Sequence, residues 1–502
     1  EDRGKLQSAV KIETYPRGTL RPARESTVTT NDTAATTKAP SGFAVAPSDT
    51  APGTGIGTEI WSFQGREPYS GGDDNWVKET AAQAIDVYYR NGTQFDKWVV
   101  VPAWWGGTDM DDVAMLYAYK ARTDTGWIAS NSTAGRFKYF AVTKNNANTD
   151  ILFGGNHVFD TGFTLGGSHT NSVTTITANS DPSSAISVGD IIICGVGDDA
   201  EQEPMLVTAL SGVSITVIRA YGDTAVTYEG GEKIHVFSPH GLKQSSDPSN
   251  SGSWSSLTKI GEQEYPITGL AVDEDSDTLL IAKTDGLWQQ YYEPTREGGR
   301  LFLRNLTIQF RENGHPTNFQ GIYAYAPGKV LLPLGNGGLL DYNVKTGDTR
   351  DISFSLVMPE RTELHGKVLA ITSGAGGVYL ALKDKSAEVL WIMAGHLITV
   401  AGVTDWAWEV LAKHTATTAI TDIQTNIWFD ATRIGHNRVW YGFPDTGADE
   451  TPRFIPAGDV DQDKTDGYTN DTDAEAVFLR YTGNLPRVPK HFTEMEIESQ
   501  NL

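Results

Sequence analysis

Apolar and polar residues alternate along most of the chain from Trp61 onward. Alternation with a period of two is typical of half-buried β-strands, in which successive side chains point to opposite faces. Few windows show the i, i+3, i+4 pattern of an amphipathic helix, and residues 79–89 (ETAAQAIDVYY) are one of these rare helix candidates. The pattern therefore predicts a mainly β fold.

One stretch shows the repeating unit most clearly. Residues 267–289 (ITGLAVDEDSDTLLIAKTDGLWQ) contain an apolar strand, an acidic turn, a second apolar strand, and then a glycine followed by an aromatic residue. Units of this kind also begin at Asp96, Arg136, Phe319, Gly366 and Thr421. A period of about 50 residues with several short strands per unit indicates a β-propeller, whose four-stranded blades are buried only by their neighbours.

The length between about residue 60 and residue 485 allows six or seven blades, once one insertion is set aside. We interpret residues 267–289 as the two central strands of one blade. Blade aromatics such as Trp288, Trp391 and Trp440 are expected to pack between neighbouring sheets. The acidic DEDSD turn (residues 273–277) is predicted to be a solvated turn on the rim.

Two segments interrupt the repeat. Residues 172–237 keep a regular alternation, with MLVTAL and SITVIRAY separated by a Ser-Gly turn, and predict a small β-barrel or sandwich inserted into one blade. Residues 1–57 are rich in Thr, Ala, Ser, Pro and Gly and cannot form a core alone, so we expect an extended arm on its own domain or on a neighbouring subunit.

The predicted organisation therefore has five parts. They are an N-terminal arm (1–57), a first set of blades (58–168), an inserted β-module (169–238), a second set of blades (239–485) and the start of a C-terminal β-domain (486–502). The last residues, HFTEMEIESQNL, stop in mid-strand by pattern. We expect the numbered residues to be part of a longer polypeptide.

Charge narrows the functional classes. The chain of 502 residues carries 63 acids and 40 bases, a formal net charge of −23. Binding to phosphate backbones needs a basic face, so this balance argues against sequence-specific nucleic-acid binding. A negative surface still suits a channel through which DNA slides without sticking.

The single cysteine and the apolar runs add further limits. Cys194 lies in the apolar run GDIIICGVG and is predicted to be a buried, inert thiol. With one cysteine the chain has no intrachain disulfide. No apolar run reaches the roughly 18 residues of a membrane-spanning helix, so no membrane span is expected.

The inserted segment carries a resemblance to a known class of proteins. SVGDIII (residues 187–193) and EPMLVTALSGVSITVIRAYGDTAV (residues 203–226) resemble a β-module that recurs in structural proteins of tailed bacteriophages. The blades look like those of phage tail and nozzle proteins, and the end of the chain is similar to the start of a β-domain that often follows them. The resemblance implies a non-enzymatic virion protein located in the tail.

Motifs for enzymatic chemistry are largely missing from the sequence. No HExxH, GxSxG or GxxxxGK[ST] pattern occurs, and GTGIGTE at Gly53 lacks the GxGxxG spacing and is interpreted as linker. Residues 245–254 (SSDPSNSGSW) resemble the Asp-box of sialidase-like propellers, with extra residues between Asp247 and Gly252. Such a box is a hairpin that braces a blade, and it supports a propeller more than a glycosidase.

Acid-rich loops offer two weaker possibilities. Asp459, Asp461 and Asp463 have the alternating spacing of a calcium loop, but Gly is missing at the sixth position and Asn470 stands at the twelfth, so a solvated loop is favoured. Acid pairs also occur in glycine- or serine-flanked turns, where turn chemistry is favoured over a catalytic carboxylate pair. These groups of acids are Asp73 with Asp74, then Asp109 with Asp111 and Asp112, and the acids of residues 273–277. No metal, cofactor or catalytic residue is predicted.

Aromatic residues raise one binding hypothesis. Residues 103–107 (AWWGG) and 406–410 (WAWEV) would form a sugar-stacking platform if their Trp side chains were exposed. A host surface glycan is therefore a possible partner, beside other copies of the chain and neighbouring tail proteins. The alternative functions are a receptor-binding or glycan-processing propeller and a bacterial adhesion propeller.

Overall fold

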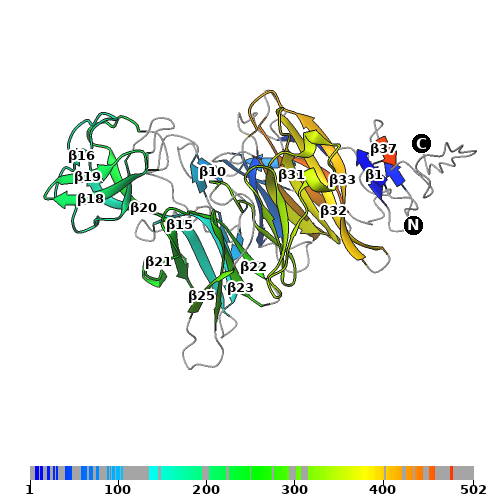
Figure 1. Cartoon of the computed structure of the whole chain (residues 1–502), viewed down its shortest axis with the longest axis horizontal. Helices are drawn as coiled ribbons and strands as arrows, with labels where there is room; N and C mark the ends of the chain where they lie inside the picture. Colours follow the sequence, from blue (N-terminus) through cyan, green and yellow to red (C-terminus); the bar gives the residue numbers. More distant parts are fainter. Residues whose placement is uncertain are drawn as a thin grey trace, which may run out of the picture.

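The computed structural model is mainly β, with one short α-helix among the residues it describes (Figure 1). The described residues are most of 135–457 together with 475–478, the strands of residues 1–134, Asn91 and Val101. The gaps within 135–457 are 145–148, 195–202, 222–224, 249, 274–275, 293–300, 307–314, 401–402, 421–424, 434–435 and 445–451. Within this part of the chain no helix is long and apolar enough to span a membrane.

Four sheets have the four-strand order of a propeller blade. The first joins β22 (Ile267–Asp273), β23 (Thr278–Lys283), β24 (Gly286–Tyr292) and β25 (Leu301–Leu306). The second joins β26 (Tyr323–Ala326), β27 (Lys329–Pro333), β28 (Leu339–Asn343) and β29 (Thr349–Asp351). The third contains β30 (Val368–Gly374), β31 (Gly377–Lys383), β32 (Val389–Val400) and β33 (Val403–Thr415). The fourth joins β34 (Asn426–Arg433), β35 (His436–Gly442), β36 (Arg453–Pro456) and β4 (Thr27–Val28).

The earlier part of the chain forms smaller and less regular sheets. One contains β5 (Thr30–Asn31), β6 (Pro40–Pro47), β7 (Thr58–Gln64), β8 (Glu67–Gly71) and β9 (Asn75–Lys78). Three are pairs: β2 (Ile12–Thr14) with β3 (Leu20–Pro22), β10 (Val87–Tyr89) with β13 (Ala103–Trp105), and β11 (Thr93–Phe95) with β12 (Trp98–Val100). The helix candidate at residues 79–89 is wrong over its last three residues, which form β10 and pair with β13. Val87 is β-branched and Tyr88 and Tyr89 are aromatic, and such residues favour strands.

The largest sheet carries the insertion. It contains β14 (Arg136–Lys144), β15 (Asp150–Thr164), β20 (Lys233–Ser245), β17 (Ile191–Cys194), β18 (Met205–Ser211), β19 (Ser214–Ile218) and β16 (Thr175–Thr177), with β21 (Thr258–Lys259) beside β20. The hairpin predicted from MLVTAL and SITVIRAY is confirmed as β18 and β19. The long strands β15 and β20 run from the propeller into the module, so the predicted limit at residue 238 falls inside β20.

The sheets follow one another in a propeller-like arrangement. The first strand of each sheet lies next to that of the following one: β14 beside β22, β22 beside β26, β26 beside β30 and β30 beside β34. Contacts continue from β34 to β6, from β6 to β11 and from β11 to β14. Of the predicted six or seven blades, the four-strand form is seen in four sheets.

Hydrogen bonds also join neighbouring sheets. The hydroxyl of Tyr323 accepts from the backbone N–H of Ser373 at 3.1 Å, which links the second sheet to the third. Thr372 Oγ1 accepts from the backbone N–H of Phe429 at 3.1 Å, which links the third sheet to the fourth. The first strands therefore hold their neighbours through polar contacts as well as apolar packing.

Apolar side chains fill the spaces between sheets, as the repeat requires. Trp391 and Trp440 are buried, and Trp288 packs half-buried against the core between β14–β15 and β22–β23. Cys194 is fully buried in the module, as predicted, and burial raises the pKa of its thiol. The prediction that residues 267–289 are the two central strands is corrected, because β22 is the first strand and β23 and β24 are central.

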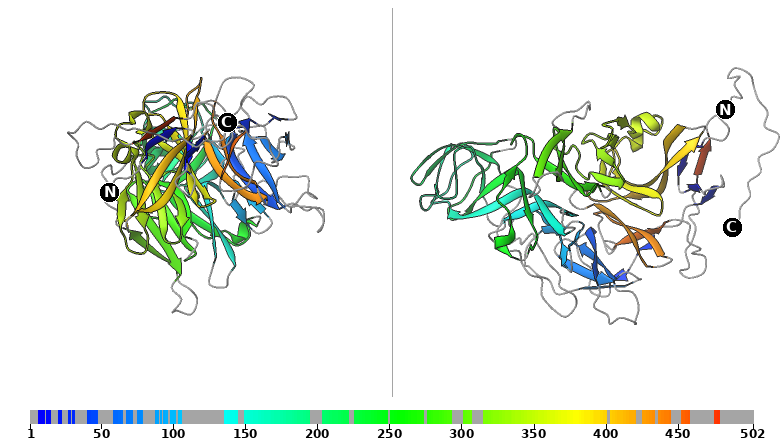
Figure 2. Two further views of the ribbon diagram at one scale, coloured as in Figure 1. Left: turned by 90° about the vertical axis from the view of Figure 1, so that its right-hand side faces the viewer. Right: turned by 90° about the horizontal axis from the view of Figure 1, so that it is seen from below.

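The N-terminal arm supplies added strands to three sheets. β1 (Leu6–Val10) lies beside β33 and also pairs with β37 (Glu475–Phe478). β4 pairs antiparallel with β36, and β5 pairs parallel with β9. The arm thus covers sheet edges on its own chain. Figures 1 and 2 place β1 and β37 at the opposite end of the molecule from β16, β18 and β19.

Candidate functional site

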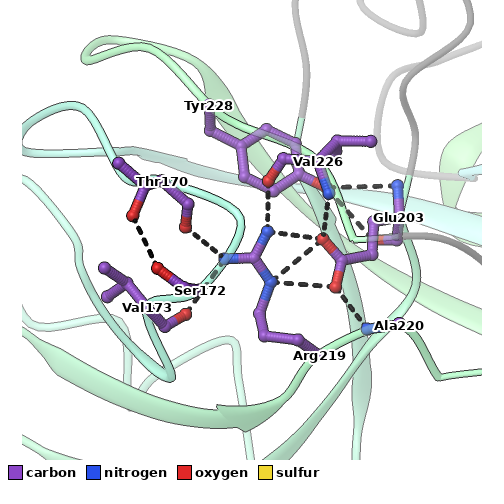
Figure 3. Close-up of polar contacts among 8 residues, drawn as sticks. All are labelled: Thr170, Ser172, Val173, Glu203, Arg219, Ala220, Val226 and Tyr228. Carbon is purple, nitrogen blue, oxygen red and sulfur yellow. Dashed lines mark hydrogen bonds and ion pairs between the residues drawn. The ribbon is translucent and has the colours of Figure 1, made fainter.

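A buried ion pair organises the inserted module (Figure 3). Arg219 Nε donates to both carboxylate oxygens of Glu203, at 2.8 and 2.9 Å, and Nη2 donates to Oε2 at 2.5 Å. Arg219 Nη1 donates to the carbonyls of Thr170 and Val173, each at 3.0 Å, and Nη2 donates to the carbonyl of Val226. One guanidinium therefore ties three segments of the module to β19: residues 170–173, Glu203 and Val226.

The partners of Glu203 complete this cluster. Its carboxylate also accepts from the backbone N–H groups of Ala220 and Val226. Its own N–H donates to the hydroxyl of Tyr228 at 3.1 Å, and the Tyr228 ring lies 5.4 Å from Arg219 Cζ. Among the described residues, each contact of the pair is internal to the module. We therefore interpret the cluster as the structural frame of the module rather than a ligand site.

The electrostatics follow from burial and pairing. The Glu203 side chain is fully buried, which alone would raise its pKa, but hydrogen bonds from Arg219, Val226 and Ala220 hold the pKa below its ordinary value. The hydrogen bonds from Arg219 to Glu203 raise the pKa of Arg219. Burial raises the pKa of Tyr228. Both charges of the pair are thus kept, while the tyrosine stays neutral.

Sequence reasoning did not single out this pair. Arg219 belongs to the Arg-Ala-Tyr turn that carries the resemblance, but Glu203 was not assigned a role. One signal was available: Arg219 is the only Lys or Arg between Lys144 and Lys233. A single base in a strongly acidic segment indicates a specific carboxylate partner, although spacing alone does not say which acid it is.

The Asp-box-like segment is a bracing turn, as predicted. Ser245 Oγ and Ser253 Oγ lie 2.6 Å apart, and Trp254 bridges back to Ser245. The Trp254 ring stacks on Phe137 of β14 with centroids 4.9 Å apart, and its indole N–H donates to the Pro248 carbonyl at 3.4 Å. The aromatic end of the box is thus used to hold the turn on its sheet.

The acidic turn at residues 273–277 is only partly the solvated turn that was predicted. Asp273 is 2% exposed. Its Oδ2 accepts from Ser276 Oγ at 2.7 Å, and its Oδ1 accepts from the backbone N–H of Gly328 in the β26–β27 turn at 2.8 Å. Asp273 therefore connects two neighbouring blades, while Asp277 is exposed.

Asp273→Ala is expected to lower the free energy of unfolding by about 1–3 kcal/mol, because it leaves the buried N–H of Gly328 without its acceptor. Asp277→Asn is the matched control, since it removes an exposed acid from the same turn and Asn tolerates the φ of 49° there. Urea unfolding followed by tryptophan fluorescence measures both. Equal midpoints for the two variants would contradict the inter-blade role.

The sugar-platform alternative at residues 406–410 is excluded by burial. Trp406 and Trp408 are 5% and 6% exposed, and their rings stack with centroids 5.1 Å apart. Trp406 Nε1 donates to Asp341 Oδ2 at 3.0 Å, and Tyr325 packs edge-on against the Trp406 ring. These rings join the second blade sheet to the third and offer no free face to a sugar.

Several candidates lie outside the described residues. They are the linker at Gly53, the acids Asp73, Asp74, Asp109, Asp111 and Asp112, and the possible calcium ligands Asp459, Asp461 and Asp463. The side chains of the AWWGG platform (residues 103–107) are also outside the description. In the part of the chain that is described, no group of three His, Cys, Asp or Glu side chains is placed to hold a metal ion.

No family model matches the chain, and no curated protein matches it. Among solved structures, "YCF48 bound to D1 peptide" aligns over 91% of this chain and 100% of its own, with 9% identity and a TM-score of 0.40. The computationally designed Ika8 protein aligns over 86% and 100%, with 12% identity and a TM-score of 0.37. The phage phi92 endosialidase aligns over 98% and 79%, with 10% identity and a TM-score of 0.32.

Proposed function

We propose that this chain is a non-enzymatic structural component of a phage virion, associated with the tail. The observation that carries the proposal is the structural role of Arg219. This residue belongs to the segment (residues 203–226) that resembles phage β-modules. Arg219 is used entirely in holding the module together through Glu203 and three backbone carbonyls. Such a module is a rigid body suited to assembly contacts rather than to catalysis.

The ring itself is part of the proposal. The contacts between first strands run from β14 through β22, β26, β30, β34, β6 and β11 and return to β14. This circuit favours seven blades over six. It would give a closed, rigid wall element, because each sheet buries its faces only against its two neighbours.

Assembly is proposed to occur through the arm and the inserted module. Several copies would form a symmetric ring or tube, with neighbouring tail proteins on either side. The net charge of −23 suits a channel wall along which DNA slides without being held. The site of action would then be the tail of the virion.

The alternative is a receptor-binding or glycan-processing propeller, with a host glycan as ligand. Two sequence features suggested this alternative, the Asp-box-like turn and the Trp pair at residues 406–408. The side chains of both are used in packing instead. The Asp-box-like turn braces β14 through Trp254, and Trp406 and Trp408 are buried between blades. A glycan array and a hydrolysis screen with the purified chain are expected to be negative, and a saturable signal in either would favour the alternative.

Mass spectrometry of purified phage particles tests the main proposal. The chain is expected at several copies per virion, at a fixed ratio to the major tail proteins. Electron microscopy of the same particles should show a ring or tube at the tail. If the chain is missing from intact particles, the proposal fails.

A further inference from the structure

An apolar row crosses the outer face of the inserted module. In register across four neighbouring strands lie Phe237 on β20, Ile191 on β17, Leu206 on β18 and Ile218 on β19. We call these four residues the outer row. The adjacent positions on each strand point the other way, into the module core, so the row lies on the face opposite that core.

Phe237 is half-buried against Val158 and Ile193, and from Ile191 toward β19 the row is increasingly exposed. Ile191 is 3% exposed, Leu206 is half-buried, and Ile218 is 51% exposed. Val188, which is 62% exposed, adjoins the row, because Gly189 beside it donates its N–H to the carbonyl of Val207, next to Leu206. Large aliphatic side chains exposed on a rigid sheet face are typical of an interaction surface.

Acidic residues of a propeller loop lie beside this face. Tyr221 donates its backbone N–H to Pro204, close to Leu206, and the pKa of its phenol is raised by burial and by the charge of Glu264. Gln263 Nε2 donates to the Gly189 carbonyl at 3.3 Å, so the propeller loop with exposed Glu262 and Glu264 reaches the same face. Residues 169–238 hold nine acids and two bases, and one of these bases is the buried Arg219.

We infer that the outer row is a docking surface for a different protein, one that presents aliphatic side chains flanked by Lys or Arg. The inference deepens the proposed function and rests on it only in taking the partner to be a neighbour in the same assembly. A second copy fits poorly, because each chain carries a net charge of −23 and the module is itself acidic. Charge complementarity therefore selects a basic, apolar partner.

Binding of a synthetic peptide with alternating Lys and Leu residues to the purified full chain tests this chemistry without any virion. Ile218→Ser with Val188→Ser removes the exposed apolar side chains without changing charge. The matched control is Leu356→Ser with Val357→Ser, two exposed aliphatics of the short helix α1 (Phe354–Val357) on the propeller. The outer-row variant is expected to weaken binding at least about tenfold, and the control less than about twofold.

Three outcomes would overturn the inference. One is equal binding by the outer-row variant and the control, which would mean nonspecific charge attraction. Another is equally strong binding of a Glu-Leu peptide. The third is a concentration-dependent dimer, detected by analytical ultracentrifugation, that disappears in the outer-row variant and so identifies a second copy as the occupant. Each outcome is independent of whether the chain is found in phage particles.

Discussion

Arg219→Ala is expected to destabilise the inserted module by about 3–5 kcal/mol, one of the two largest effects we predict. The substitution leaves the fully buried carboxylate of Glu203 without its counter-ion and frees the carbonyls of Thr170, Val173 and Val226. Removing one partner of a buried pair costs far more than the pair itself contributes, because the remaining charge stays desolvated.

The single cysteine makes this effect measurable within the module. Cys194 is fully buried in the same core, so a disulfide reagent such as 4,4′-dithiodipyridine labels it only when the module opens. A loss of about 3 kcal/mol raises the labelling rate roughly a hundredfold when opening is in rapid equilibrium. Labelling at an unchanged rate would show that the pair does not stabilise the module.

An exposed ion pair provides the control. Arg350 Nη2 and Asp405 Oδ1 lie 2.6 Å apart on the propeller, with side chains 49% and 53% exposed. Arg350→Ala is expected to cost less than about 1 kcal/mol, because solvent screens the pair. It should leave Cys194 labelling unchanged, since it lies on a different part of the molecule.

The Glu203–Arg219 pair also predicts a pH dependence. The folded pKa of Glu203 is held below the ordinary value of 4.5, so its contribution to stability is fully present above that value. The contribution is lost as the pH falls through the folded pKa. Without Arg219, burial raises the pKa of the Glu203 carboxyl, so the folded variant takes up a proton at a higher pH than the wild type. The difference in labelling rate between wild type and Arg219→Ala should therefore narrow as the pH falls from neutral toward the lowered folded pKa of the wild type.

The periodic pattern predicted the blades where both faces of a sheet are buried. In β22, β23 and β24 the apolar residues lie against neighbouring sheets. Burial between sheets requires apolar residues along each strand, and the sequence shows them directly. Asp273 shows the limit of such reasoning. It has the composition of a solvated turn, yet Gly328 of the next blade makes it a buried contact, and that proximity arises only when the ring forms.

The edges of the sheets were not predictable in the same way. Thr27 and Val28 form the outer strand beside β36, but two residues of a Thr-rich arm carry no apolar alternation. Edge pairing depends on backbone hydrogen bonds, which any sequence without proline supplies. The pairing of Glu203 with Arg219 was missed for a related reason, because it depends on the fold rather than on local spacing.

Deleting residues 1–35 is expected to produce the other large effect. The truncation removes β1, β4 and β5 and leaves the edges of β33, β36 and β9 without their added strands. Several net hydrogen bonds of about 0.5–1.5 kcal/mol each are lost, and the open edges become available to other chains. We expect a lower melting temperature and concentration-dependent aggregation, measured by scanning fluorimetry and by light scattering after gel filtration.

A shorter deletion separates edge protection from mere loss of residues. Removing residues 1–14 takes away β1 and β2, which opens the edge of β33 and leaves β37 and β3 without their partner strands. β4 and β5 stay in place, so β4 still completes the sheet that contains the buried Trp440. Its melting temperature should fall between those of the full chain and the longer truncation. If the longer truncation instead melts like the full chain and stays monomeric, the sheets are stable without the arm. The arm would then be free to pair with a neighbouring subunit, where an open sheet edge accepts a strand in the same way.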